Sequence, residues 1–349
     1  MSRVGIITFL HNGNYGSSLQ AYALQRVVRE AGHECSHIDY RPDTREKILN
    51  MIRCGNSPRL LLDGKKKRQV QGAQAGIREK YRAIDDFYAR KMRLSSPCRN
   101  RGELERISGD YDLLLCGSDQ IWNPVWMNPA YFLDFGEPEK RRVAYAPSLG
   151  ISIAPGRRKC RMIRRMTELF DAVSVREEEG ARLMVTITGK RPPVMPDPVC
   201  LLTREEWEET AAPGPGGGPY LLCYFIGENP SYWQRVRELS GKTGLRPLVI
   251  PVTAESYDSG FELLDGAGPE EFLGAAAGAE ALCTDSFHGL AFGTIFEKKT
   301  DLIRRYREED RESKNSRVDH FLRETAGKGL EAMRREGLAW LGENLAPDA

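Results

Sequence analysis

Short apolar runs alternate along this chain with stretches in which apolar residues recur at helical spacing. The first run, residues 4–9, is followed by a glycine-containing loop at residues 11–18 and by a helical pattern that ends at Gly32. Seven further apolar runs predict strands over residues 34–40, 112–116, 142–146, 172–175, 220–225, 247–251 and 281–284. Because strands and helices alternate, the pattern predicts an α/β fold with parallel sheets.

Two proline-rich stretches, residues 192–198 and 213–219, separate the first series of strands from the second. Such stiff or glycine-rich segments mark loops and linkers. At 349 residues the chain is also longer than one hydrophobic core normally supports. We therefore predict a doubly wound domain over residues 1–200 and a second over residues 201–349 that ends in a helical tail. The polar residues of about 41–108 predict a helical insertion in the first domain.

Composition narrows the class of protein. The chain is 40% hydrophobic and 29% charged, as is typical of globular proteins, and its net charge of +2 gives no basis for a nucleic-acid partner. One dense basic run, residues 65–68, is interpreted as a solvated loop rather than a phosphate or membrane patch. The eight cysteines contain no C-x-x-C pair, which indicates cytosolic thiols rather than disulfides or a zinc site. The sequence shows no signal peptide and no apolar stretch of membrane-spanning length, so it predicts a cytoplasmic protein without membrane insertion.

The most informative chemistry lies at residues 284–289, Thr-Asp-Ser-Phe-His-Gly, between a buried strand and a helix. In an open α/β sheet, ligands bind beyond the carboxyl ends of the strands. A helix that begins there offers free N–H groups and the positive end of its dipole to an anion. His288, one of five histidines, would sit in the first turn and could move a proton near neutral pH. The sequence therefore predicts an enzyme that handles a phosphorylated or carboxylated small molecule.

A second polar cluster, residues 117–124, directly follows another predicted strand. At the carboxyl end of a strand, its hydroxyl, carboxylate, amide and indole groups suit a polyhydroxylated ligand. These groups belong to Ser118, Asp119, Gln120, Trp122 and Asn123. The alternative is that Asp119 caps a turn and Trp122 fills the core.

Two other strand ends carry weaker signals. Arg176 follows a strand and could clamp a phosphate or carboxylate, although a surface pair with Glu177 is the alternative. Asn14, Tyr15 and Gly16 belong to a glycine loop that favours close approach of the backbone to a ligand. This loop lacks the lysine of a P-loop and the full dinucleotide fingerprint.

The sequence gives little support for a metal. Asp110 and Asp112 form a D-x-D pattern, but they lie where a strand begins, which is the wrong end for a site in this kind of sheet. We therefore predict no metal site.

Taken in order, these segments resemble the polysaccharide pyruvyl transferase family. The resemblance covers most of the chain apart from residues 41–108, and the set of motifs with its order is specific although no single motif is decisive. The segments that carry it are residues 14–24 (NYGSSLQAYAL), 117–124 (GSDQIWNP), 145–150 (YAPSLG), 174–177 (SVRE), 196–199 (PDPV) with Trp207, 284–289 (TDSFHG) and 314–317 (KNSR).

The resemblance implies a fold similar to the GT-B glycosyltransferases, with two Rossmann-like domains facing a cleft. Characterised members transfer a pyruvyl group from phosphoenolpyruvate to two hydroxyls of a sugar and so form a cyclic ketal. Phosphoenolpyruvate would then be a co-substrate, and no further cofactor is expected. The acceptor would be a sugar or a lipid-linked glycan on the way to a cell-surface polymer. The acceptor sugar, the ketal stereochemistry and the oligomeric state stay open.

The resemblance also implies roles for residues. The family's site histidine corresponds to His288, and its phosphoenolpyruvate-holding arginine corresponds to Arg176. Better-known members carry Arg-Leu-His where this chain has Ser286-Phe287-His288, so Arg304 or Arg305 would supply the missing charge.

The remaining assignments follow from the same comparison. Asp119 is our candidate for a second catalytic group that binds or deprotonates the acceptor, and Ser286 and Gly289 are candidates for donor binding. The candidates for acceptor binding are Asn14, Tyr15, Gly16, Ser118, Gln120, Trp122 and Asn123.

Two alternatives stay open. One is a GT-B glycosyltransferase that uses a nucleotide sugar. The other is a non-catalytic glycan- or partner-binding protein that keeps the fold, although the density of polar groups at three strand ends argues against it.

Overall fold

The computed structural model describes residues 1–57, 75–305 and 315–346. Its first sheet consists of β1 (Arg3–Ile7), β2 (Glu34–His37), β3 (Leu113–Cys116), β4 (Arg141–Ala144) and β5 (Ala172–Val173). These strands are all parallel and lie in the order β2-β1-β3-β4-β5. The register pairs Val4 of β1 with Cys35 of β2 and Leu113 of β3. Since β1 and β3 are almost fully buried, their continuous apolar sequences suit the middle of a parallel sheet covered on both faces.

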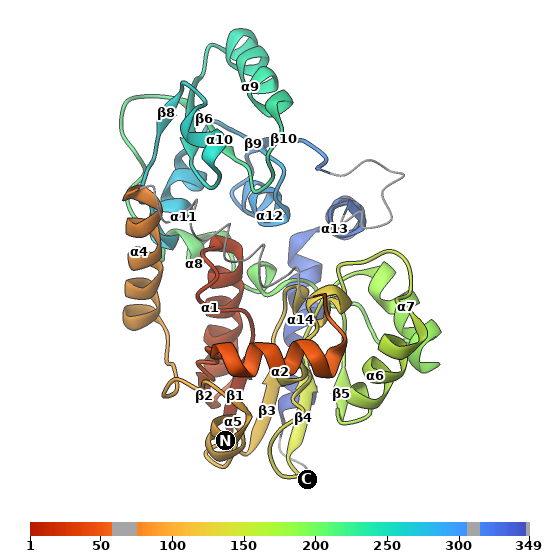
Figure 1. Ribbon diagram of the computed structural model, residues 1–349. Coiled ribbons are helices and arrows are strands. Elements are labelled where there is room, and N and C mark those ends of the chain that lie inside the picture. The colour runs from red at the N-terminus through yellow and green to blue at the C-terminus, as the bar shows by residue number, and fades with distance from the viewer. Residues whose placement is uncertain (58–74, 306–314, 347–349) are drawn as a thin grey trace.

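The second sheet repeats this plan. Its strands are β6 (Tyr220–Tyr224), β7 (Arg246–Ile250), β8 (Glu262–Leu263), β9 (Ala281–Thr284) and β10 (Lys299–Leu302). They are again all parallel, in the order β10-β9-β6-β7-β8. The two-sheet α/β fold is therefore confirmed (Figure 1). The edge strands β8 and β10 were not predicted, because their short sequences EL and KTDL carry too few apolar residues to stand out.

Helices connect the strands of the first sheet. Their α-helices are α1 (Tyr15–Glu30), α2 (Thr44–Cys54), α4 (Ala75–Lys91), α5 (Arg101–Ser108), α6 (Arg157–Thr167) and α7 (Glu178–Thr188). Short 3₁₀ turns follow β3 and α7, namely η1 (Gln120–Trp122), η2 (Pro124–Trp126), η3 (Pro129–Phe132) and η4 (Pro198–Leu201). The side chain of Asn14 begins α1 by accepting hydrogen bonds from the backbone N–H groups of Gly16 and Ser17. The glycine loop predicted for ligand approach is thus a capped helix start.

The second sheet has its own set of helices. They are α8 (Arg204–Glu208), α9 (Pro230–Thr243), α10 (Ala254–Tyr257), α11 (Pro269–Gly278) and α12 (Phe287–Ile295), and the chain ends in α13 (Asn315–Gly327) and α14 (Gly329–Leu345). Figure 1 shows α14 running back alongside the first sheet. There Trp340 lies with its ring centroid 5.8 Å from that of Tyr145, and Gly337 packs against Leu201. The C-terminal tail therefore packs on the first sheet's domain, while the exact boundary at residue 200 stays a prediction.

Part of the polar insertion at about 41–108 links the two domains. Figure 1 shows α4 standing beside both of them. Near its C-terminal end, Arg90 and Lys91 form ion pairs with Glu270 of α11. Gly268 lies so close to Ala83 of α4 that an added Cβ would come within 2.8 Å of the alanine Cβ. Residues 58–74, which include the basic run 65–68, lie outside the described residues.

Aromatic packing joins the domains next to the start of α1. The ring of Tyr15 stacks on that of Phe272 at 4.9 Å between centroids, and its hydroxyl donates to the carbonyl oxygen of Ala267. Tyr15 is 1% exposed. Its predicted role in acceptor binding is therefore wrong, because the side chain is part of the interdomain core.

Two further observations complete the fold. All eight cysteines are free thiols. Within the described ranges, no helix combines the length and the apolar character that crossing a membrane requires.

Candidate active site

A cavity of about 390 Å³ lies between the carboxyl ends of the two sheets. Its wall includes Phe9, Asp119, Ile226, Ser286 and Ile303, which follow β1, β3, β6, β9 and β10 in turn. The helix α13 adds Arg317. This is where parallel α/β sheets place their ligands, and the volume suits a small-molecule site.

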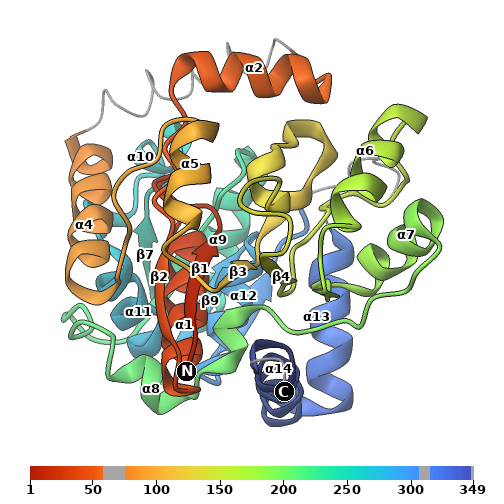
Figure 2. The same cartoon turned by 90° about the horizontal axis from the view of Figure 1, so that it is seen from below.

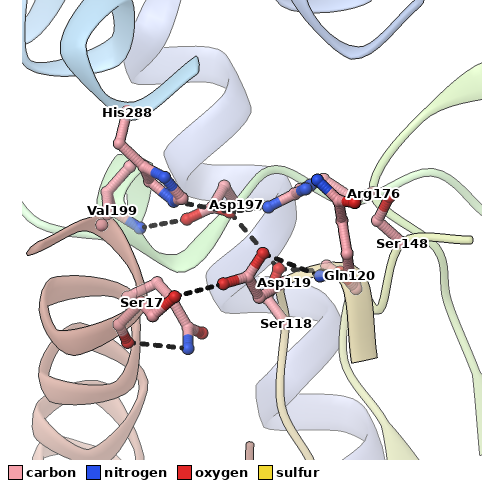
Figure 3. A network of polar contacts seen from close by, with 12 residues as sticks. Ser17, Ser118, Asp119, Gln120, Ser148, Arg176, Asp197, Val199 and His288 are labelled. Atoms are coloured by element: carbon pink, nitrogen blue, oxygen red, sulfur yellow. Dashed lines mark hydrogen bonds and ion pairs between the residues drawn. The ribbon is translucent and has the colours of Figure 1, made fainter. Parts of the chain in front are cut away.

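His288 enters this cavity from the first turn of α12 (Figure 3). The side chain of Ser286 caps the helix by accepting from the backbone N–H of Gly289 at 3.3 Å. The first backbone bond of the helix runs from Leu290 to Ser286, so the N–H groups of Phe287 and His288 precede it. The predicted strand, turn and helix at residues 284–289 are confirmed. The backbone N–H of Gly289, however, bonds to the capping side chain of Ser286 and is not available to bind a substrate.

The ring of His288 packs directly on the start of α1. A Cβ added to Gly16 would lie 2.0 Å from Nδ1 of His288, so only glycine leaves room for the imidazole in this position. His288 is 5% exposed, and its Nε2 lies 3.6 Å from Oδ2 of Asp197. Gly16 therefore acts by positioning the histidine across the domain boundary.

Asp197 is the centre of a buried ionic network (Figure 3). Its Oδ2 accepts from Nη1 of Arg176 at 2.5 Å and from Oγ of Ser118 at 3.4 Å, and its Oδ1 accepts from the backbone N–H of Val199. Burial opposes the charge, but His288 and Arg176 hold the pKa of Asp197 well below its ordinary value. Asp197 was not among the predicted site residues. The available signal was its place between Pro196 and Pro198, in the first of the two proline-rich stretches.

Asp119 is a second buried carboxylate near the histidine, and it lines the cavity. Its carboxylate accepts from Oγ of Ser17 at 2.6 Å and from the backbone N–H of Gln120 at 2.7 Å. Burial again opposes ionisation, but the charges of Arg176 and His288, with these hydrogen bonds, lower the pKa of Asp119 below 3.8. Its φ of +78° is strained for a residue with a side chain, as is common at functional sites.

Arg176 is 3% exposed and does not line the cavity. Besides its bond to Asp197, it lies 3.7 Å from Glu177, and its guanidinium carbon is 4.9 Å from the ring centroid of Phe287. Burial disfavours its charge, but Asp197, Glu177 and Asp119 keep the pKa of Arg176 above its ordinary value. Its Nε and Nη2 have no hydrogen-bond partner among the described residues. The predicted donor arginine therefore sits behind the cavity wall, where it neutralises the buried carboxylates.

Among the described residues, the cavity is also lined by Arg304, Arg305 and Arg317. Nε of Arg305 donates to Oδ2 of Asp285 at 2.8 Å, and Nη2 of Arg304 donates to Asp319. Both Nη atoms of Arg317 lie 2.8 Å from the side-chain oxygen of Gln120 when that amide is oriented to accept from them. Burial and the nearby charge of Arg176 lower the pKa of Arg317 to about 10, so the guanidinium remains charged at neutral pH. Arg317 belongs to the segment 314–317 that carries the family resemblance, but the sequence predicted no role for it. Lys314 of that segment lies outside the described residues.

The predicted acceptor residues divide into two groups. Asn14 and Gln120 line the cavity, as do Ser17 and Trp126, which the sequence did not single out. The strand-end cluster at residues 117–124 thus reaches the cavity, but through fewer side chains than predicted.

The other acceptor candidates of this cluster are core residues, which corrects the prediction. Trp122 is 0% exposed, stacks on Phe132 at 4.8 Å and donates from its indole N–H to the carbonyl oxygen of Tyr131. Ser118 donates to the carbonyl oxygen of Ala146, and Asn123 caps η2, which leaves neither side chain for a sugar. Trp122 therefore fills the core, which is the alternative that the sequence left open.

The cavity holds groups for a proton and for an anion rather than a metal cage. Among the residues that the structure describes, no three or more His, Cys, Asp or Glu side chains are grouped to hold a metal ion. The cavity does combine an imidazole, two carboxylates and three guanidinium groups. Such a set can bind a small anion and move protons beside it.

Solved structures confirm the architecture. UDP-GlcNAc 2-epimerase from Neisseria meningitidis, bound to UDP-GlcNAc, aligns with a TM-score of 0.51 at 10% identity, over 99% of this chain and 99% of that chain. A putative UDP-N-acetylglucosamine 2-epimerase from Listeria monocytogenes aligns with a TM-score of 0.51 at 10% identity, over 96% and 90%. A further UDP-N-acetylglucosamine 2-epimerase gives 0.52 at 11% identity, over 100% and 98%. At this identity the likeness shows the fold alone, which is of the GT-B type.

Sequence comparisons identify the family. No curated protein gives a significant match. The family model described as polysaccharide pyruvyl transferase, however, matches residues 14–300, which include the catalytic candidates on both sides of the cavity. The chain therefore belongs to the polysaccharide pyruvyl transferase family.

Proposed function

We propose that this protein transfers a pyruvyl group from phosphoenolpyruvate to two hydroxyls of a sugar and forms a cyclic ketal. The observation that carries the proposal is the meeting of His288 and Asp119 with Arg304, Arg305 and Arg317 in one cavity. Phosphoenolpyruvate carries a phosphate and a carboxylate, and guanidinium groups bind both in bidentate geometry. The first turn of α12 adds the positive end of a helix dipole.

In this proposal the cavity arginines, and not Arg176, contact the donor. Arg305 is held by Asp285, which also accepts from the backbone N–H groups of Ile226 and Gly227. Arg317 is held by Gln120 from the opposite domain. Together they would supply the charge that the Ser286-Phe287-His288 motif lacks beside its histidine, while the hydroxyl of Ser286 remains engaged in the helix cap.

The reaction requires an acid that donates a proton to phosphoenolpyruvate and a base that accepts a proton from a sugar hydroxyl. His288 would protonate the methylene carbon of the donor, which leaves an oxocarbenium-like centre at the neighbouring carbon. One sugar hydroxyl adds to that centre, inorganic phosphate leaves, and a second hydroxyl closes the ketal. Asp119, kept ionised by its surroundings, would accept the proton of one hydroxyl, and the proton of the other would pass to the released phosphate. Asp197 would orient the imidazole of His288 through their 3.6 Å contact.

Thermal unfolding with candidate donors tests the proposal. Saturating phosphoenolpyruvate should raise the melting temperature, since a ligand at a hundredfold excess over its Kd stabilises by about 2.7 kcal/mol. The shift should disappear in Arg317→Ala, whereas Arg182→Ala, an exposed arginine of α7, should keep it. His288→Ala should stay folded and lose about 10²- to 10⁴-fold in turnover.

The same assay separates the competing function. The structural neighbours named above include one bound to UDP-GlcNAc. A shift with nucleotide sugars and none with phosphoenolpyruvate would overturn pyruvyl transfer in favour of a glycosyltransferase. Near-full turnover in His288→Ala would remove that residue from the mechanism.

A further inference from the structure

The helix α2 is oriented against the usual rule of burial. Its outward face carries Ile48, Leu49 and Ile52, which are 38%, 51% and 64% exposed. Its inward face instead buries Glu46 and Asn50, whose side chains bond to each other at 3.1 Å. Helices on a protein surface normally turn their apolar stripe inward. An exposed aliphatic face of this kind marks an interaction site.

A strongly basic helix adjoins this face. Nη2 of Arg158 donates to the carbonyl oxygen of Arg53, and Nζ of Lys159 donates to Oδ1 of Asn56, so the start of α6 contacts the end of α2. Just before α6, Ile153 is 57% exposed. The start of α6, with an exposed aliphatic residue shortly before it, thus lies against the end of α2.

The basic residues in the first turn of α6 run against the helix dipole. Its sequence RRKCRMIRRMT contains six basic residues and no acidic one, and its first turn holds Arg157, Arg158 and Lys159 without a side-chain cap. Positive charge at a helix N-terminus is unfavourable. Of the six, only Lys159 is partly buried, and the other five are exposed. Because acidic and basic residues nearly balance over the whole chain, the net charge does not reveal this cluster of basic residues.

We propose that α2 and α6 form a docking surface for an anionic lipid bilayer. The aliphatic side chains of α2 would enter the boundary between headgroups and acyl chains, and the basic side chains of α6 would lie against lipid phosphates. Exposed aliphatic residues beside lysines and arginines are the features of helices that lie in a membrane interface. Nucleic acid would match the charges but offers no apolar phase for Ile48, Leu49 and Ile52. The docking is peripheral and does not depend on the reaction proposed above.

The surface lies behind one wall of the cavity. Figure 2 shows α2 along the outer edge of the molecule. Asn56, two residues beyond the end of α2, donates to the carbonyl oxygen of Met127 at 2.8 Å, and Met127 directly follows Trp126 of the cavity wall. If the proposed reaction holds, docking would bring the acceptor side of the cavity close to sugars carried on lipids.

Flotation with vesicles tests the docking. The full chain is mixed with vesicles of phosphatidylcholine alone, or of phosphatidylcholine and phosphatidylglycerol in equal parts, and the floating fraction is measured. We expect flotation with the anionic vesicles only, reduced by salt. Ile48→Ser/Leu49→Ser/Ile52→Ser should abolish it. Arg157→Gln/Arg161→Gln/Arg165→Gln should weaken it by about a hundredfold, at about fivefold per charge.

A matched variant controls for the loss of any exposed apolar side chain. Val185→Ser/Leu338→Ser removes residues that are 42% and 38% exposed elsewhere, and it should float as the wild type does. Unchanged melting temperatures would show that all variants fold. The proposal is wrong if the wild type floats with neither vesicle, or if the triple serine variant floats normally. Binding to single-stranded RNA without flotation would assign the basic helix to nucleic acid instead.

Discussion

The imidazole of His288 fills the space that a side chain at Gly16 would need. The two residues belong to helices of different domains, α12 and α1, and an added Cβ would lie 2.0 Å from Nδ1. The glycine is thus required by a close approach between domains rather than by its own backbone angles. This contact fixes how the cavity closes around the histidine.

Gly16→Ala should therefore behave as a loss of His288. The methyl group displaces the imidazole from Asp197, so turnover should fall by about 10²- to 10⁴-fold, as for the loss of a positioned acid. Steady-state kinetics measures the effect. The control is Gly241→Ala in α9, where an added Cβ meets nothing within 4 Å and turnover should not change. Wild-type turnover in Gly16→Ala would show that the ring need not sit there.

Asp197→Asn should destabilise the fold. It leaves the charge of Arg176, whose side chain is 2% exposed, without its closest counter-ion. Breaking a buried pair in this way costs about 3–5 kcal/mol. The double variant Asp197→Asn/Arg176→Met, which removes the orphaned charge, should recover part of that loss in urea unfolding. Additive losses in the double variant would contradict the network described here.

Acid should weaken the protein through the same carboxylates. The folded-state pKa values of Asp119 and Asp197 lie below their ordinary 3.8, so their stabilisation is present above that pH and is lost as the pH falls below it. Urea midpoints should therefore drop steeply below about pH 4. Asp119→Asn should flatten that drop, whereas Asp258→Asn, an exposed position, should leave it unchanged. Equal slopes in all three proteins would mean that Asp119 does not contribute.

Gly274→Ala should destabilise the second domain, where α11 packs against the segment that follows α8. A Cβ there would lie 2.1 Å from the carbonyl oxygen of Ala212, which is backbone and cannot rotate away. Overpacking of this kind costs about 1–3 kcal/mol. By contrast, Gly241→Ala should stabilise α9 by about 0.5–1 kcal/mol. Differential scanning calorimetry should show melting temperatures that shift in opposite directions in the two variants. An unchanged melting temperature in Gly274→Ala would show that the backbone at Ala212 can move to make room.

Most elements of the fold follow from local patterns in the sequence. Strands such as β3 and β9 are buried in the middle of parallel sheets, so their apolar runs are visible in the chain. The cap at Asn14 and the strand-turn-helix at residues 284–289 are equally local, because a few neighbouring residues decide them. His288, Asp119 and Gln120 could be singled out for this reason.

Tertiary structure alone decided which of these groups meet. Trp122 and Arg176 follow strands in the same way as Asp119, but packing turned the indole into the core and the guanidinium behind the cavity wall. Arg317 comes from a helix beyond both sheets and reaches Gln120 across the cleft. The edge strand β10 was not predicted because KTDL carries too few apolar residues, and the helical pattern of α2 did not show that its aliphatic side chains face outward. Local sequence patterns predict which residues are buried and which form turns. The partner of each charged side chain, by contrast, depends on contacts between residues far apart in the chain.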